Sequence, residues 1–201
     1  MNLRYIKTKW FITAVIAIAS LSTWLSSIGC PGMIVKCASP SVLVALLLYF
    51  FDKWLWRWRP FSFVMNVSDI SGHYEGEITF VIQGEHRAKK CQLDVKQSAS
   101  KVSVQTRFIG DGSGEPSTAS HSLIAAIRKR EGDEQEQLVF FYENQGSQQK
   151  GDDLGQHFGT NVLNVNVGEN GSIALDGYYF TNRKPTQTMG KMTVTRKAAK
   201  E

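Results

Sequence analysis

The sequence has 201 residues, of which 42% are hydrophobic, and this composition excludes a disordered or low-complexity chain. Its three cysteines are too few for a disulfide-dense scaffold, and its length allows one domain of ordinary size plus an attachment. Residues 1–60 carry seven basic residues and one acidic residue, and they therefore account for the net charge of +5. Residues 61–201 carry 16 basic and 17 acidic residues, which disfavours a nucleic-acid polymer as their partner.

The first 60 residues are predicted to be a membrane anchor with two transmembrane helices. Residues 10–28 contain no charged residue, and their length is close to the roughly 20 residues that a helix needs to cross a bilayer. A second apolar run covers residues 41–51 and continues into a segment rich in tryptophan and arginine, which is typical of a membrane interface. Basic residues precede the first run and follow the second, so the positive-inside rule places both termini in the cytoplasm.

Two other interpretations of this segment stay open. One is a cleaved signal peptide, because a basic start is followed by an apolar stretch and small residues. The other is a single span followed by an interfacial segment. Cys30 and Cys37 lie between the two runs, where an oxidising periplasm allows either a disulfide or two free thiols. Cys91 lies apart from them and is expected to be a buried, small apolar residue.

After Pro60 the pattern changes from continuous apolar runs to an alternation with a period of two, which is typical of β-strands with one buried face. Many short strands without an intervening helix predict that residues 61–201 form an antiparallel up-and-down β-barrel of about eight strands. Such a barrel is just wide enough to hold side chains or one small ligand. The expected strands are 70–83, 88–98, 101–109, 118–129, 136–144, 155–167, 171–183 and 189–197.

Alternate residues of a strand face the same side, so the apolar positions identify which residues point into the barrel. In an up-and-down barrel the odd-numbered strands end, and the even-numbered strands begin, at the same mouth. The polar residues expected inside this mouth are Thr106, Tyr142, Asn144, His157, Asn161, Thr181 and Arg183. The apolar residues expected to fill the other end are Val102, Leu138, Val165, Val167, Ile173 and Leu175.

A cavity with an apolar floor and a few converging polar groups is typical of a small-molecule site. Arg183 is the main candidate because its planar guanidinium suits a phosphate, and Tyr142 and Tyr179 are candidates for stacking on bases or sugars. The alternative is that Arg183 lies in solvent and the tyrosines only fill the core. No enzyme is predicted, since the four histidines lack metal-ligand spacing and no nucleophile elbow supports a hydrolytic triad.

The order of several short motifs behind two apolar runs resembles one bacterial antiphage family. The chain is similar to the two-transmembrane, β-strand-rich effectors of the cyclic-oligonucleotide-based antiphage signalling system (CBASS). The resemblance covers nearly the whole chain. The matching segments are DISGHYEG at 69–76, SHS at 120–122, LVFFY at 138–142, HFGT at 157–160, LDGYYFTNR at 175–183, and Gly190.

The resemblance implies a non-enzymatic effector of the inner membrane that needs no cofactor. In such systems a nucleotidyltransferase (CD-NTase) makes a cyclic dinucleotide after infection. The barrel is expected to bind this ligand and to form a homo-oligomer. The transmembrane helices gathered in this way are expected to disrupt the lipid bilayer and kill the infected cell.

The candidate ligand contacts follow from both the barrel pattern and the resemblance. Beside Arg183, Tyr142 and Tyr179, the secondary polar candidates are Thr106, Ser120, His157, Thr160 and Thr181. Thr160 is included for the motif alone, because the alternation points it outward. Two other functions stay open: a membrane-anchored, lipocalin-like carrier or sensor of a small apolar ligand, and a structural protein with a filled barrel.

Overall fold

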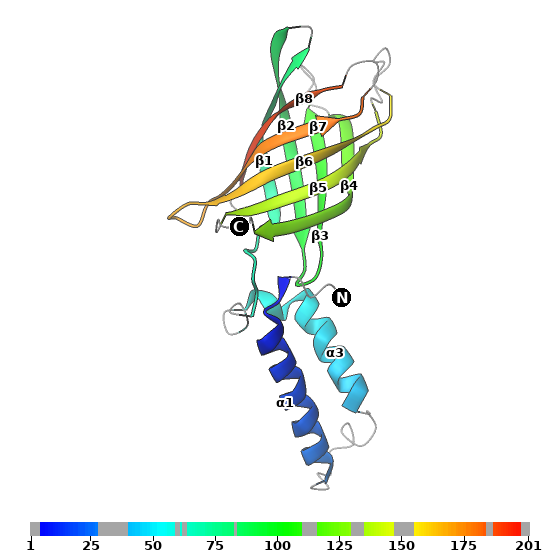
Figure 1. Ribbon diagram of the computed structural model, residues 1–201, viewed down its shortest axis with the longest axis vertical. Coiled ribbons are helices and arrows are strands. Elements are labelled where there is room, and N and C mark those ends of the chain that lie inside the picture. Colours follow the sequence, from blue (N-terminus) through cyan, green and yellow to red (C-terminus); the bar gives the residue numbers. More distant parts are fainter. Residues whose placement is uncertain are drawn as a thin grey trace. The chain divides into compact units, whose positions relative to one another are not determined.

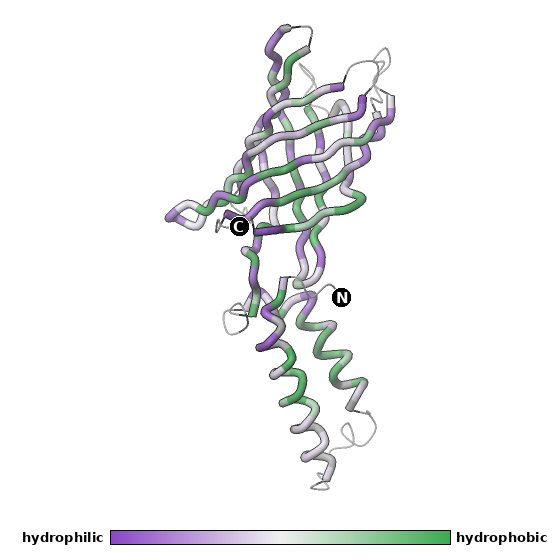
Figure 2. The backbone as a smooth tube through the Cα atoms, viewed as in Figure 1, coloured by the Kyte–Doolittle hydropathy of each residue, from purple (hydrophilic) through white to green (hydrophobic). Residues whose placement is uncertain are grey.

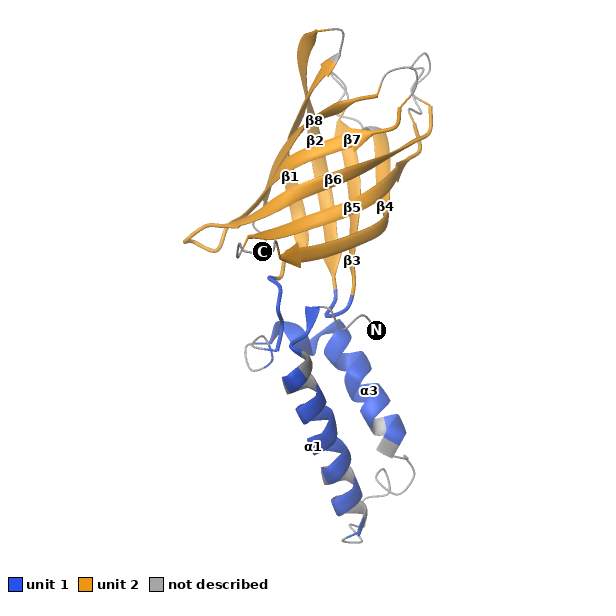
Figure 3. Cartoon of the chain, viewed as in Figure 1, with its two compact units in different colours: residues 1–68, 98–100 blue, residues 69–97, 101–201 orange. Residues whose placement is uncertain are grey.

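The computed structural model describes residues 5–27, 40–58, 61, 64–82, 84–109, 116–129, 135–146, 155–183 and 187–197. The chain divides into two compact units, shown in separate colours in Figure 3. The first contains residues 1–68 and 98–100, and the second contains residues 69–97 and 101–201. Cys30 and Cys37 lie outside the described residues.

Two α-helices form most of the first unit, and they coincide with the two apolar runs of the sequence. They are α1 (Thr8–Ser27) and α3 (Pro40–Lys53), and a short 3₁₀ helix, η2 (Leu55–Arg57), follows. Ahead of α1, Ile6 pairs antiparallel with Met65, and the N–H of Lys7 donates to the carbonyl of Val64 at 2.8 Å. In the described part of the chain, no helix is both long enough and apolar enough to span a membrane.

The second unit is a closed antiparallel barrel in which each strand pairs with its neighbours in sequence and β8 closes on β1 (Figure 1). The predicted barrel of eight strands is therefore confirmed. The strands are β1 (Gly72–Ile82), β2 (Glu85–Gln97), β3 (Val102–Ile109), β4 (Pro116–Lys129), β5 (Glu136–Asn144), β6 (His157–Val167), β7 (Ile173–Thr181) and β8 (Met189–Arg196).

The alternation expected from the sequence produces the barrel core, and Figure 2 shows hydrophilic and hydrophobic segments alternating along several strands. The largest buried side chains come from many strands, and each contributes roughly 1.5–3 kcal/mol to folding. They include Tyr74, Leu93, Ile127, Leu138, Phe140, Leu163, Leu175 and Met192. Cys91 is buried as predicted.

The prediction that Val167 lies in the core is wrong. Val167 is 57% exposed, although the alternation placed it inside the apolar end. The ladder between β5 and β6 ends at the Gln137–Asn164 pair, so the last residues of β6 extend beyond β5. The strand keeps its alternation there, but the barrel wall that would cover Val167 has already ended.

A β-bulge in β4 decides which of its residues face inward. The register against β5 shifts between Ser122 and Ile124. Before the shift the even-numbered Thr118 and Ser120 are buried, and after it the odd-numbered Ile127 is buried. An extra residue in one strand moves every later side chain to the other face, so β4 supplies polar groups to one end and an apolar residue to the other.

Candidate ligand-binding site at the barrel mouth

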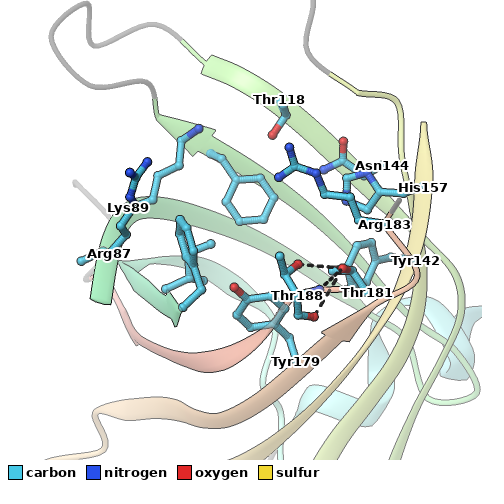
Figure 4. A pocket seen from close by; sticks show the side chains of 14 residues that line it. Arg87, Lys89, Thr118, Tyr142, Asn144, His157, Tyr179, Thr181, Arg183 and Thr188 are labelled. Atoms are coloured by element: carbon cyan, nitrogen blue, oxygen red, sulfur yellow. Dashed lines mark hydrogen bonds between the residues drawn. The ribbon is translucent and has the colours of Figure 1, made fainter. Parts of the chain in front are cut away.

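A cavity of about 440 Å³ opens at the end of the barrel where the odd-numbered strands finish, and this volume lies within the range of about 300–1,000 Å³ found for small-molecule sites. Its walls combine apolar, aromatic, hydroxyl and cationic groups (Figure 4). Side chains from β1 to β7 reach it, together with Thr188 just ahead of β8, because an up-and-down barrel brings neighbouring strands to the same mouth. The lining residues are Ile78, Phe80, Arg87, Ala88, Lys89, Phe108, Thr118, Tyr142, Asn144, His157, Tyr179, Thr181, Arg183 and Thr188.

Two buried tyrosines form the aromatic part of the wall. Tyr142 and Tyr179 are 5% and 6% exposed. Burial raises the pKa of Tyr179 to about 12 and raises the pKa of Tyr142 above its ordinary range, so both phenols are neutral at pH 7. Each ring therefore offers a flat apolar face and a hydroxyl that can donate a hydrogen bond.

Glycines on the neighbouring strands make room for both rings. A Cβ at Gly159 would lie 2.3 Å from the Tyr142 hydroxyl oxygen and 2.7 Å from the carbonyl oxygen of Phe180. A Cβ at Gly190 would lie 2.7 Å from Cε1 of Tyr179. All three distances are well below ordinary van der Waals contact, so each ring can occupy its place only because the neighbouring glycine has no side chain.

A hydrogen-bonded pair of threonines joins the end of β7 to the residue just ahead of β8. The hydroxyls of Thr181 and Thr188 are 2.7 Å apart, and the N–H of Thr181 donates to the carbonyl of Thr188 at 2.9 Å. The N–H of Thr188 in turn donates to the Thr181 hydroxyl at 3.2 Å. These bonds position Arg183, which follows β7 by two residues.

Two further polar side chains have one atom engaged and another left for a ligand. The Oδ1 atom of Asn144 accepts the N–H of Gly146 at 2.9 Å, which leaves its amide nitrogen as a donor. The Nδ1 atom of His157 lies 3.0 Å from the carbonyl oxygen of Gly155. Because a carbonyl can only accept, Nδ1 carries the hydrogen, and Nε2 is left to interact with a ligand.

The cavity is positively charged. Arg87, Lys89 and Arg183 line it, and none of the lining residues that the structure describes is Asp or Glu. Arg87 pairs with Glu85 at 3.1 Å. Within the described part of the chain, Lys89 and Arg183 form no ion pair. The site therefore suits a small anionic ligand with aromatic groups.

The structure brings five of the eight sequence candidates together in this cavity: Tyr142, His157, Tyr179, Thr181 and Arg183. Thr106 and Ser120 are not among the lining residues; they lie opposite each other on β3 and β4 and are 2% and 3% exposed. Thr160 lies on the outer face of the barrel, where it pairs with Phe141 and Phe180, and this placement is the one its strand alternation predicted.

Sequence reasoning missed Arg87 and Lys89. The predicted second strand began at residue 88, whereas β2 begins at Glu85 and pairs with β1 as far as Ile82. The missed signal was the alternation itself. Cys91 and Leu93 face the interior, so counting back along the strand by twos places Lys89 and Arg87 on the same side.

Comparison with known proteins identifies the family to which the chain belongs. A protein of Staphylococcus schleiferi named CD-NTase-associated protein 15 is 30% identical over 57 residues, which are 28% of this chain and 31% of that protein. The chain thus matches less than a third of the length of that relative. The family described as "Cap15, cyclic dinucleotide receptor domain" matches residues 65–196, which contain the whole barrel and every cavity residue. The predicted resemblance to CBASS effectors is confirmed, and the chain belongs to the Cap15 family of cyclic dinucleotide receptor domains.

Proposed function

We propose that the barrel binds a cyclic dinucleotide in its mouth cavity and that the chain acts as a CBASS effector. The observation that carries the proposal is that three kinds of group line one cavity: cations, buried tyrosine rings and hydrogen-bond donors. A cyclic dinucleotide presents the complementary groups, namely phosphates, flat bases and ring acceptors. Its size also suits a cavity of about 440 Å³ that is open at one end.

Each group has a separate role in this proposal. The Arg183 guanidinium donates two parallel hydrogen bonds to a phosphate. Tyr142 and Tyr179 stack on the bases, an interaction worth roughly 1–3 kcal/mol per base. The amide nitrogen of Asn144 donates to base or ribose oxygens. Residues 61–201 have a net charge near zero, with 16 basic and 17 acidic residues, so a small ligand fits better than a polymer.

The proposed output is disruption of the inner membrane by an oligomer whose termini lie in the cytoplasm. Exposed apolar residues on α1 and α3, among them Ile12, Ile16 and Leu46, support insertion of the first unit into a bilayer. Trp54 and Trp58 are also exposed and are typical of a membrane interface.

Self-association is supported by an apolar row on the outside of the barrel. One residue from each of the strands β4 to β8 is paired with the next across the sheet: Ile124, Phe141, Thr160, Phe180 and Met189. All but Thr160 are exposed apolar residues, which is unusual for the surface of a monomer. The name of the staphylococcal relative supports a link to a CD-NTase that supplies the ligand.

Isothermal titration of the full-length protein with a panel of cyclic dinucleotides tests the proposal. We expect saturable binding by at least one of them, and Arg183→Ala should weaken it by roughly 10–100-fold, because a charge-assisted bond contributes about 1.5–3 kcal/mol. Lys191→Ala, an exposed cation on β8 outside the cavity, is the control and should bind as wild type does. A folded protein that binds no member of the panel would overturn the proposal, and co-purified lipid in the barrel would favour the lipocalin-like carrier.

A further inference from the structure

The turn end of the β1–β2 hairpin extends past the neighbouring strands and stands beside the mouth (Figure 1). β1 pairs with β8 only as far as the Phe80–Gly190 pair, and β2 pairs with β3 only from Cys91 onward. Among the described residues, Glu85–Lys90 therefore pair with β1 alone. We call residues 81–82 and 84–90 the hairpin arm.

The hairpin arm carries its own cationic surface toward the cavity. Arg87 and Lys89 both line the cavity, and both have the inward alternation of Cys91. Arg87 is held by Glu85 at 3.1 Å, so an anion of the same strand occupies part of its guanidinium. Lys90 lies on the opposite face of the same strand, is exposed, and does not line this cavity.

The two sets of cations come from different walls. In Figure 4, Arg87 and Lys89 lie on one side of the cavity, and Arg183 lies on the opposite side next to Asn144 and His157. Tyr142 lies on the Arg183 side, beside His157, and Tyr179 lies between the two sides. Cations on opposite sides of one cavity suit two separate anionic groups better than one compact anion.

We propose that Arg87 and Lys89 form a second anion-binding wall and that the cavity holds a ligand with two anionic groups, one against Arg183 and one against the hairpin arm. This inference rests on the proposed function, because it assumes that the mouth cavity is the ligand site. Binding of the second anion ties the hairpin arm to the barrel through the ligand. The anion also replaces Glu85 as a partner of Arg87.

The test uses full-length protein and two probes: the cyclic dinucleotide that binds wild type, and an analogue in which one phosphodiester is replaced by a neutral linker of similar length. The combined variant Arg87→Ala/Lys89→Ala should weaken binding of the natural ligand by about tenfold or more. The same variant should weaken binding of the singly charged analogue by less than about threefold, since that analogue already uses the Arg183 wall. Lys90→Ala is the matched control on the same strand and should leave both affinities unchanged.

The variant Glu85→Gln should change the affinity for the natural ligand in the opposite direction. It removes the carboxylate that competes for Arg87, so the natural ligand should bind about two- to threefold more tightly. Unchanged or weaker binding by Glu85→Gln would count against the role of Arg87. All substituted side chains are exposed or half-buried, so a thermal unfolding curve serves to confirm that each variant is folded.

Hydrogen exchange gives a readout beside affinity. Ligand should slow amide exchange of residues 85–90 in wild type and in Lys90→Ala, but not in Arg87→Ala/Lys89→Ala. The two-wall inference is overturned if the double variant keeps wild-type affinity while Arg183→Ala loses it, or if the double variant weakens both probes equally. Wild-type protein that binds no cyclic dinucleotide would overturn the proposed function and this inference together.

Discussion

The contact between Tyr142 and Gly159 links barrel stability to the binding cavity, and Gly159→Ala tests it. The added methyl carbon would lie 2.3 Å from the tyrosine oxygen and 2.4 Å from Cζ, whereas ordinary contact begins at 3.4 Å. The ring must therefore withdraw by about 1 Å. It cannot do so freely, because Tyr142 is 5% exposed and packs against Phe140 with ring centroids 6.0 Å apart.

Overpacking of this kind costs roughly 1–3 kcal/mol in a well-packed core. For a protein of this size that cost corresponds to a decrease in melting temperature of roughly 2–12 °C. Because the displaced ring also forms part of the cavity wall, ligand affinity should fall by about fivefold or more, within the range expected for a lost stacking contact. Thermal unfolding by circular dichroism and titration calorimetry measure the two effects on the same sample.

Gly155→Ala is the matched control, because a Cβ at Gly155 meets nothing within 4 Å. Its melting temperature and affinity should match wild type, since surface substitutions usually change stability by less than about 0.5 kcal/mol. Gly159 and Tyr142 should also be energetically coupled. The double variant Gly159→Ala/Tyr142→Ala should lose less free energy of unfolding than the sum of the losses in the two single variants. If Gly159→Ala unfolds at the same temperature as Gly155→Ala, the ring does not rest on the glycine and the reasoning is refuted.

Two further predictions concern the β1 strand. A hydrogen bond from the Lys197 ammonium, and to a smaller extent one from His73, holds the pKa of the Glu75 carboxyl below its ordinary value. The stability that the Glu75 carboxylate contributes is therefore present above about pH 4.5 and is lost as the pH falls through the lower pKa of the folded state. Urea unfolding should therefore show Glu75→Gln less stable than wild type at pH 7 and equal to it near pH 2, and a difference independent of pH would contradict this. The buried hydroxyl of Tyr74 donates to the carbonyl of Ile70 at 2.7 Å. Tyr74→Phe should lower the free energy of unfolding by about 1–3 kcal/mol, whereas Tyr178→Phe, at a residue that is 63% exposed, should change it little, and equal effects would argue against the bond.

The sequence alone was sufficient for the barrel and for most of its mouth. Side-chain direction in a strand alternates strictly, so apolar residues such as Leu138 and Phe140 also fix the direction of Tyr142 on the same strand. Connection order then placed the polar ends of the odd strands at one mouth. This reasoning predicts five residues inside that mouth, and the structure places all five in the cavity: Tyr142, His157, Tyr179, Thr181 and Arg183.

Tertiary structure decided what depends on where one strand ends relative to its neighbours. The exposure of Val167 follows from the end of the β5 ladder, and the inward face of β4 follows from its bulge. The depth of a side chain also depends on the tilt and length of all eight strands, which is why Thr106 and Ser120 are buried away from the cavity. The second cationic wall likewise exists because β1 and β2 continue past the strands beside them, and a period-two pattern carries no information about the length of a neighbouring strand.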